Sequence, residues 1–318
     1  MESEEINDEP KNKNTTFLKY NELSCRYDSF MLLQIYLFND YFIKLNINLN
    51  NNEKSLFDIG NYIYSLPDGE LNKGFWTILS NSNLDKLNIC SVANGFKDFY
   101  PISNIYDFLK NSDNFCINVN SHMHCQLCNY NYSKNFYYGP LISIYKNDIK
   151  MKSLKDIIFS KFNIFEGSCE VCSFDESEKI KKDDIYKICK KTFFTDLKFP
   201  PIISFILDLS DNNEIDEFQY YNLENLLNYY KHLIIEKINI CDKEYILKGI
   251  INQISINHYS ATLLNINNEE KNICEGNIYY YDSQKNNNQI IQLNNENDID
   301  RINIILSQKP LILTYIRE

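Results

Sequence analysis

The stretch "NELSCRYDSFMLLQIYLF", residues 21–38, carries a single cysteine, Cys25, at the head of an almost uninterrupted apolar run. The polar residues before it are typical of a turn, and the apolar run predicts a buried helix. A helix N-terminus offers unpaired backbone N–H groups and the positive end of the helix dipole, which lower the pKa of a thiol toward the reactive thiolate. Cys25 is therefore a candidate nucleophile. The alternative is a small core residue, because lone cysteines are usually packed in the interior.

Two further residues could complete the chemistry of such a thiol. His258, in "ISINHYSATLL", is expected at the start of a strand, and Asp282, in "IYYYDSQ", at the end of another. Neighbouring antiparallel strands could bring the two side chains within hydrogen-bond distance. The carboxylate would then fix the tautomer of the imidazole and leave its other nitrogen to face a thiol. The alternative is a histidine at a strand edge and an aspartate that forms a turn.

Two Cys-x-x-Cys pairs, with forty residues between them, predict a metal site at Cys125, Cys128, Cys169 and Cys172. Each pair can present two thiolates to one ion, and two pairs complete a tetrahedral site with four sulfur ligands. Four thiolates leave no position for water, so we expect one structural zinc ion per chain and no catalytic cofactor. His122 and His124 lie just before the first pair and are alternative ligands. The remaining alternative is four unrelated cysteines.

The composition narrows the class of protein. With 318 residues, 44% hydrophobic and 14% aromatic, the chain can bury a large core. A formal net charge of −11 argues against a nucleic-acid binder and suits a partner with basic character. The sequence shows neither a membrane span nor a secretory signal, so we expect no membrane partner, reduced thiols among the ten cysteines, and a cytoplasmic or nuclear location.

The elements that must position these residues follow from the same pattern. Residues 1–15 are expected to be a disordered acidic tail. Apolar residues at helical spacing predict helices at 28–38, 54–65 and 102–110, and β-branched or aromatic runs divided by turn residues predict strands from 199 onward. Helices early and strands late predict an α+β protein with segregated layers.

The order of these pieces resembles that of the ubiquitin-specific protease family, over most of the chain. "SCRYDSF" resembles its cysteine box, "YILKGIINQISINHYSATLL" (245–264) its histidine box, and "IYYYDS" (278–283) the motif that holds its catalytic acid. Between them, "IYDFLKN" weakly resembles its acidic-Phe-Leu helix, "KFPPIISFILDL" resembles its "LPP-aliphatic" strand, and "MHCQLC", "SLKDIIFSKF" and "CEVC" follow its finger region in order and spacing.

The resemblance implies a papain-like cysteine protease fold with thumb, palm and zinc-bearing fingers within a catalytic domain over 16–318. The thumb would span about 17–116, the fingers about 117–176 and the palm about 177–318. Cys25 would attack the carbonyl after the C-terminal Gly-Gly of a ubiquitin-like modifier, His258 would take and return the proton, and Asp282 would orient the histidine. Backbone N–H groups at the helix start would stabilise the oxyanion.

The sequence departs from the family pattern at three places. The family's oxyanion asparagine lies five residues before the cysteine, where this chain has Tyr20, and Asn21 is the nearest substitute. The position three after the cysteine is normally Asn but here is Asp28, which resembles the divergent SUMO-isopeptidase branch. The histidine is normally preceded by Gly, which Asn257 replaces.

We therefore expect a thiol hydrolase that acts on conjugates of ubiquitin. The finger region favours ubiquitin, whereas Asp28 favours SUMO or another modifier as the alternative substrate. Two further hypotheses are a catalytically weak scaffold that binds a modifier, which the altered oxyanion position favours, and a zinc-stabilised interaction domain, which would leave the C-terminal motifs unexplained.

Overall fold

The computed structural model describes the chain in segments, which are residues 17–20, 24–37, 48–75, 77–78, 106–107, 109–124, 129–145, 148, 153–162, 165–166, 190–208, 233–235, 237–255, 258–264, 278–285, 288–293 and 298–318. The helices are α1 (Cys25–Leu37), α3 (Asn51–Ser65), α4 (Asp68–Leu71), α7 (Leu154–Phe162) and α11 (Asp298–Ser307). The strands are β1 (Ile117–His124), β2 (Asn131–Tyr138), β3 (Leu141–Tyr145), β4 (Phe165–Glu166), β5 (Lys190–Lys198), β6 (Ile202–Asp208), β7 (Lys237–Ile240), β8 (Lys243–Ser255), β9 (His258–Leu264), β10 (Ile278–Tyr281), β11 (Ile290–Leu293) and β12 (Pro310–Arg317).

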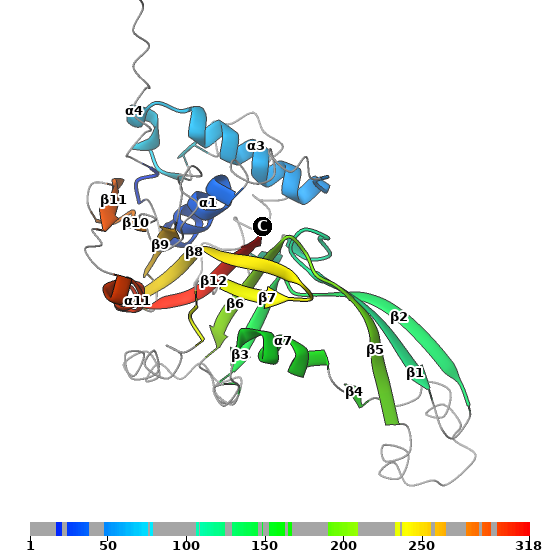
Figure 1. Cartoon of the computed structure of the whole chain (residues 1–318). Helices are drawn as coiled ribbons and strands as arrows, with labels where there is room; N and C mark the ends of the chain where they lie inside the picture. The colour runs from blue at the N-terminus through cyan, green and yellow to red at the C-terminus, as the bar shows by residue number, and fades with distance from the viewer. Residues whose placement is uncertain are drawn as a thin grey trace, which may run out of the picture.

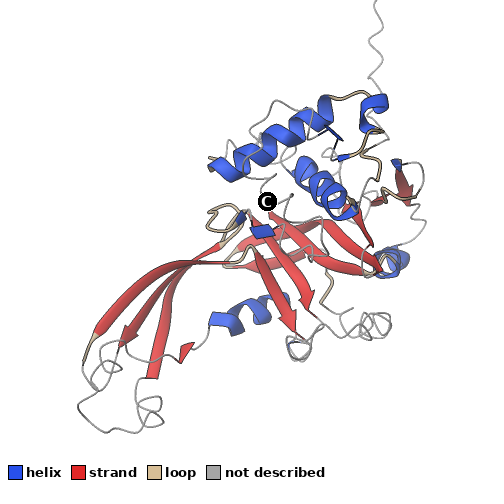
Figure 2. Ribbon diagram, turned by 180° about the vertical axis from the view of Figure 1, so that it is seen from behind, coloured by secondary structure: helices blue, strands red, loops and turns tan. Residues whose placement is uncertain are grey.

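The strands of the described segments form two sheets. The larger has eight strands in the order β11-β10-β9-β8-β12-β6-β3, with β7 paired to β8, and all pairs are antiparallel except β3 with β6. The smaller has four strands in the order β2-β1-β5-β4, all antiparallel. Figure 1 shows the smaller sheet extending away from the larger one, with α1 and α3 on one side of the larger sheet and α7 on the other. Figure 2 shows the same arrangement from behind.

Both faces of the larger sheet are covered by apolar residues. Along β8, Ile251 belongs to the core that contains α1 and α3, whereas its neighbour Ile250 belongs to a second core that contains α7. Leu263 and Leu264 of β9 divide in the same way. Because side chains alternate between the faces of a strand, a strand covered on both sides is apolar throughout. This explains the long apolar run of β8. Strand β9 is also buried along its whole length, although it carries the polar side chains of His258, Ser260 and Thr262 between apolar ones.

Helix α1 packs directly on β8, and a glycine allows the close approach. A Cβ atom at Gly249 would lie 2.0 Å from Cδ1 of Leu33, which is itself fully buried. The contact sets the distance between α1 and the sheet. It therefore also sets the position of Cys25 in the first turn of this helix.

We expect Gly249→Ala to lower the free energy of unfolding by about 1–3 kcal/mol, because overpacking forces neighbouring side chains out of place. Denaturant unfolding measures the loss. Gly69→Ala is the matched control, since nothing lies within 4 Å of a Cβ built there. Equal stabilities of the two variants would contradict this account of the α1 contact.

The architecture agrees with a mixed α/β protein and with the expected helices at 28–38 and 54–65, which are α1 and α3. Of the helix expected over 102–110, the described residues 106–107 and 109 form a 3₁₀ turn. The fingers were expected to end at about residue 176. The two sheets do not correspond to a division of the chain there, because β5 belongs to the smaller sheet and β3 to the larger. The tail expected over 1–15 lies outside the described residues. No helix among the described segments is long and apolar enough to span a membrane.

Candidate active site

Cys25 is the first residue of α1 and is 1% exposed. Ser24 begins the helix, because its carbonyl accepts the backbone N–H groups of Tyr27 and Asp28, each at 2.8 Å. The backbone of Tyr259, the residue after His258, hydrogen-bonds to the thiol of Cys25. The structure therefore places Cys25 beside the first residues of β9.

The segment before α1 is tied to the strand that leads to Asp282. The backbone N–H of Tyr20 donates to the carbonyl of Ser283 at 3.1 Å, and the hydroxyl of Tyr281 donates to the carbonyl of Leu18. Residues 17–20 thus join the lead-in of the helix to β10 and the turn that follows it. Three segments far apart in the sequence meet here, and each carries one of the predicted catalytic residues.

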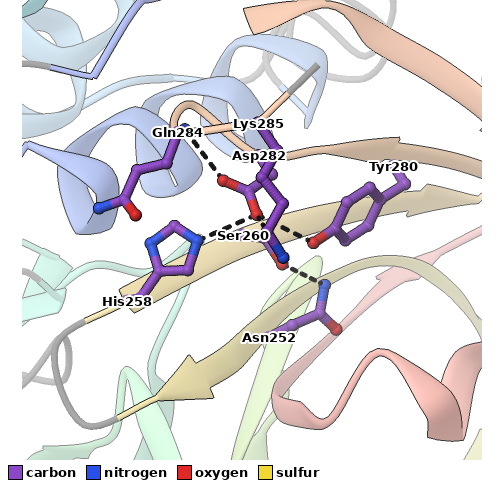
Figure 3. Close-up of polar contacts among 7 residues, drawn as sticks. All are labelled: Asn252, His258, Ser260, Tyr280, Asp282, Gln284 and Lys285. Atoms are coloured by element: carbon purple, nitrogen blue, oxygen red, sulfur yellow. Dashed lines mark hydrogen bonds and ion pairs between the residues drawn. The ribbon is translucent and has the colours of Figure 1, made fainter. Parts of the chain in front are cut away.

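His258 and Asp282 form a buried pair, as Figure 3 shows. Nε2 of His258 lies 2.9 Å from Oδ2 of Asp282, and the carboxylate is fully buried. Nδ1 of His258 is buried and has no hydrogen-bond partner among the described residues. The carboxylate holds a proton on Nε2, so Nδ1 is left as the basic nitrogen of the ring.

The surroundings of Asp282 keep its carboxylate ionised. Burial acts to raise its pKa, but the hydrogen bond and the charge of His258 act against burial, together with the backbone N–H of Gln284 and the ammonium of Lys285. The combined effect lowers the pKa below the usual 3.8. The Gln284 N–H donates to Oδ1 at 2.9 Å, and Lys285 Nζ lies 3.8 Å from Oδ2. Asp282 is therefore an anion at neutral pH that can stabilise an imidazolium.

Burial opposes ionisation of the Cys25 thiol. Burial raises the pKa of Cys25 to about 11, while hydrogen bonds from the backbone of Tyr259 and Arg26 lower it and the charge of Asp28 raises it. The expectation that the helix start lowers the pKa of Cys25 is therefore wrong for this structure, because the loss of solvation outweighs the backbone donors. The thiol is protonated at neutral pH and needs a base to react.

Asp28 is fully buried one turn after Cys25, and the Ser24 hydroxyl donates to its Oδ2 at 2.8 Å. Burial raises the pKa of Asp28 well above 3.8, and side-chain hydrogen bonds with Ser24 and Ser283 offset only part of the shift.

The predicted oxyanion residue Asn21 lies outside the described residues, and so do all four predicted zinc ligands, which are Cys125, Cys128, Cys169 and Cys172. The two alternative ligands, His122 and His124, lie exposed on β1 and hydrogen-bond to Ser133 and Asn131 of β2. Among the described residues, no group of three or more histidine, cysteine, aspartate or glutamate side chains is placed to hold a metal ion.

Sequence reasoning missed one side chain of the site. The hydroxyl of Tyr280 donates to Oδ2 of Asp282 at 3.3 Å. A signal was present, because residues two apart in an extended segment point to the same side. The further partners of Tyr280 lie on β9 and β8. They depend on how β10 pairs with β9 and β9 with β8, and this register cannot be read from spacing along the sequence.

No protein-family model matches the sequence, and no curated protein matches it. Solved structures do. The Ubp8-Sgf11-Sgf73-Sus1 SAGA DUB module is 14% identical, with a TM-score of 0.51 over 96% of this chain and 68% of that chain. A Ubp8/Sgf11/Sus1/Sgf73 SAGA DUB module bound to monoubiquitin is 15% identical, with a TM-score of 0.52 over 96% and 70%.

The PAN2 pseudoubiquitin-hydrolase-RNase module of Saccharomyces cerevisiae is 11% identical, with a TM-score of 0.55 over 96% of this chain and 53% of that chain. The chain thus spans about half of that protein's length. At these identities the likeness shows the fold alone, which this chain shares with the two DUB modules and the pseudoubiquitin-hydrolase module.

Proposed function

We propose that this chain is a thiol-dependent hydrolase that cleaves the peptide or isopeptide bond after the C-terminal Gly-Gly of ubiquitin. The observation that carries the proposal is the geometry around His258. Asp282 holds one ring nitrogen at 2.9 Å, the other is buried without a partner among the described residues, and the next residue hydrogen-bonds to Cys25. A cysteine, a base and an orienting carboxylate in this arrangement are the components of nucleophilic acyl transfer.

In the proposed reaction, Nδ1 of His258 takes the proton of the Cys25 thiol as the sulfur attacks the carbonyl carbon of the modifier's last glycine. The carbon–nitrogen bond breaks, the amine leaves with the proton from His258, and a thioester remains. Water, deprotonated by His258, then attacks the thioester and releases the modifier and the free thiol. Asp282 stabilises the imidazolium in both halves, and backbone N–H groups at the start of α1 face the developing oxyanion.

Ubiquitin is the substrate that we favour over SUMO. A solved structure of similar fold is a DUB module bound to monoubiquitin, and the chain carries a net charge of −11, which suits the basic residues ahead of the Gly-Gly end of ubiquitin. The smaller sheet, extending from the larger one, is the element that we assign to the fingers (Figure 1). SUMO remains the alternative because of Asp28.

The test of substrate choice is competitive labelling with equal amounts of ubiquitin and SUMO probes, each bearing a C-terminal thiol-reactive group. Preferential coupling of ubiquitin supports the proposal. Coupling of the SUMO probe alone would contradict the assignment of the substrate while leaving the chemistry intact.

A second candidate is a module that binds a modifier without cleaving it. The pKa of about 11 for Cys25 favours it, because a buried neutral thiol is a poor nucleophile until a base takes its proton. Binding of ubiquitin without coupling to the probe would favour this candidate.

We also propose that the four predicted cysteines bind one structural zinc ion. The described strands fit such a site, because β1 ends just before Cys125 and β2 begins just after Cys128. On the other side, β4 ends at Glu166, three residues before Cys169, and β5 begins at Lys190, eighteen residues after Cys172. Met123 of β1 pairs with Thr192 of β5, so the four strand ends that flank the cysteine pairs lie at one end of the smaller sheet. Bound zinc would hold these two segments together.

Elemental analysis of the purified, reduced protein is expected to give one zinc ion per chain. Cys169→Ser is expected to release the ion and to weaken ubiquitin binding before it changes the rate of bond cleavage, because bound zinc would hold two segments of the chain together and take no part in the chemistry at Cys25. Cys241→Ser is the matched control, since Cys241 is an exposed free cysteine in the turn between β7 and β8. Metal-free protein with reduced cysteines would contradict the zinc site.

A further inference from the structure

A chain of buried hydroxyl and amide groups leads from the neighbouring strands to the carboxylate of Asp282 (Figure 3). The hydroxyl of Tyr280 in β10 donates to Oδ2 of Asp282 at 3.3 Å. The hydroxyl of Ser260 in β9 forms a side-chain hydrogen bond with Tyr280. Nδ2 of Asn252 in β8 lies 3.2 Å from Oγ of Ser260 and 2.8 Å from Oγ1 of Thr262. Three adjacent strands therefore contribute to one network.

The direction of these hydrogen bonds is set by their ends. The amide of Asn252 can only donate through Nδ2, so Ser260 accepts from it and keeps its own proton for the Tyr280 oxygen. Tyr280 in turn keeps its proton for Asp282, which as an anion can only accept. Every group in the chain thus donates toward the carboxylate, and hydrogen bonds aligned in this way polarise and strengthen one another in a medium of low dielectric constant.

The network is shielded from solvent and holds its protons. Asn252, Ser260 and Thr262 are fully buried, and Tyr280 is 7% exposed. Burial raises the pKa of Tyr280 to about 12, with the charge of Asp282 acting in the same direction and Ser260 acting against it. The phenol therefore stays a donor over the whole range of pH in which a cysteine hydrolase works.

The network of hydrogen bonds that reaches Asp282 through Tyr280 does not include His258, the side chain that Asp282 orients. During the proposed reaction His258 gains and loses a proton, so its bond to Oδ2 changes strength in every cycle. Gln284 holds Oδ1 through its backbone, whereas Tyr280 is the described side-chain hydroxyl that holds Oδ2.

On the basis of the proposed hydrolase function, we propose that Tyr280 is a positioning residue, which the hydrogen bonds through Ser260 and Asn252 orient so that Asp282 keeps one rotamer while His258 changes its protonation. This would allow the His258 ring to return Nδ1 to the same place for each proton transfer.

The test compares Tyr280→Phe and Ser260→Ala with Tyr279→Phe. Tyr279 lies on the same strand but packs against the core on the other face of the sheet, so its variant removes a hydroxyl without touching the network. We expect Tyr280→Phe to lower kcat about tenfold with KM unchanged, and Ser260→Ala to lower kcat by a smaller factor. In the double variant the two effects are expected to overlap, with no loss beyond that of Tyr280→Phe, because both act through one hydroxyl.

A measurement that needs no substrate separates this proposal from the proposed function. The proton on Nε2 of His258 gives a resolved NMR signal when Asp282 holds it, and we expect that signal to broaden in Tyr280→Phe and in Ser260→Ala but not in Tyr279→Phe. Broadening in a protein that cleaves no modifier would support the positioning role and refute the hydrolase. An active protein in which Tyr280→Phe keeps both kcat and the sharp signal would overturn the positioning role and leave the hydrolase standing.

Discussion

Replacement of Cys25 by alanine is expected to abolish hydrolysis of a ubiquitin C-terminal amide, with a loss of rate on the order of a millionfold. No other group at the start of α1 can form the thioester, so the variant retains only what binding and the oxyanion donors supply. The fold is expected to survive, because the substitution removes one atom from a residue packed against the sheet. Release of the fluorescent amine measures the rate, and the affinity for ubiquitin measures the intact surface.

Cys116→Ala is the matched control for this variant. Cys116 is also 1% exposed, and its sulfur lies 3.2 Å from the carbonyl oxygen of Leu109. Its loss is expected to change stability but not the rate of cleavage per folded molecule. Full activity in Cys25→Ala, or inactivity of a folded Cys116→Ala, would contradict the assignment of the nucleophile.

The second large effect is expected at the base. His258→Ala should lower kcat nearly as far as Cys25→Ala, because burial raises the pKa of the thiol to about 11 and the thiol then needs a base to react. Asp282→Asn should cost less, at most about 10⁴-fold, because it alters the tautomer and orientation of the ring but leaves the base in place.

Both substitutions are measured as kcat and KM on the same amide substrate. KM is expected to stay near its wild-type value, since neither side chain is expected to contact the modifier away from the scissile bond. Equal losses in the two variants would show that Asp282 does more than orient His258. An Asp282→Asn variant as active as wild type would show that Asp282 has no part in the mechanism.

Much of the site could be predicted from the sequence because its parts follow local patterns. The apolar run after Cys25 predicted α1, since a helix that is buried on most sides is apolar on most sides. The aromatic and β-branched runs at His258 and before Asp282 predicted β9 and β10, and the polar residue at each strand end was a candidate for chemistry. The pairing of these two strands placed the side chains together.

The smaller sheet could not be predicted in the same way. Strand β2, "NYSKNFYY", is exposed or partly exposed along its whole length, so it lacks the alternation that marks a half-buried strand. The raised pKa of Cys25 could not be predicted from the sequence either, because the burial of this thiol depends on the packing of α1 against β9. The hydrogen-bond network that reaches Asp282 through Tyr280 could not be predicted either. It depends on the register of three strands, which no spacing along the chain reveals.

The most direct test of the central claim is coupling of a ubiquitin probe with a C-terminal thiol-reactive group, followed by mass mapping of the modified cysteine. The account predicts one covalent adduct per chain on Cys25, formed at a rate that His258→Ala lowers strongly and Cys241→Ser does not change. An adduct on another cysteine, or a folded protein that binds ubiquitin and forms no adduct, would contradict it.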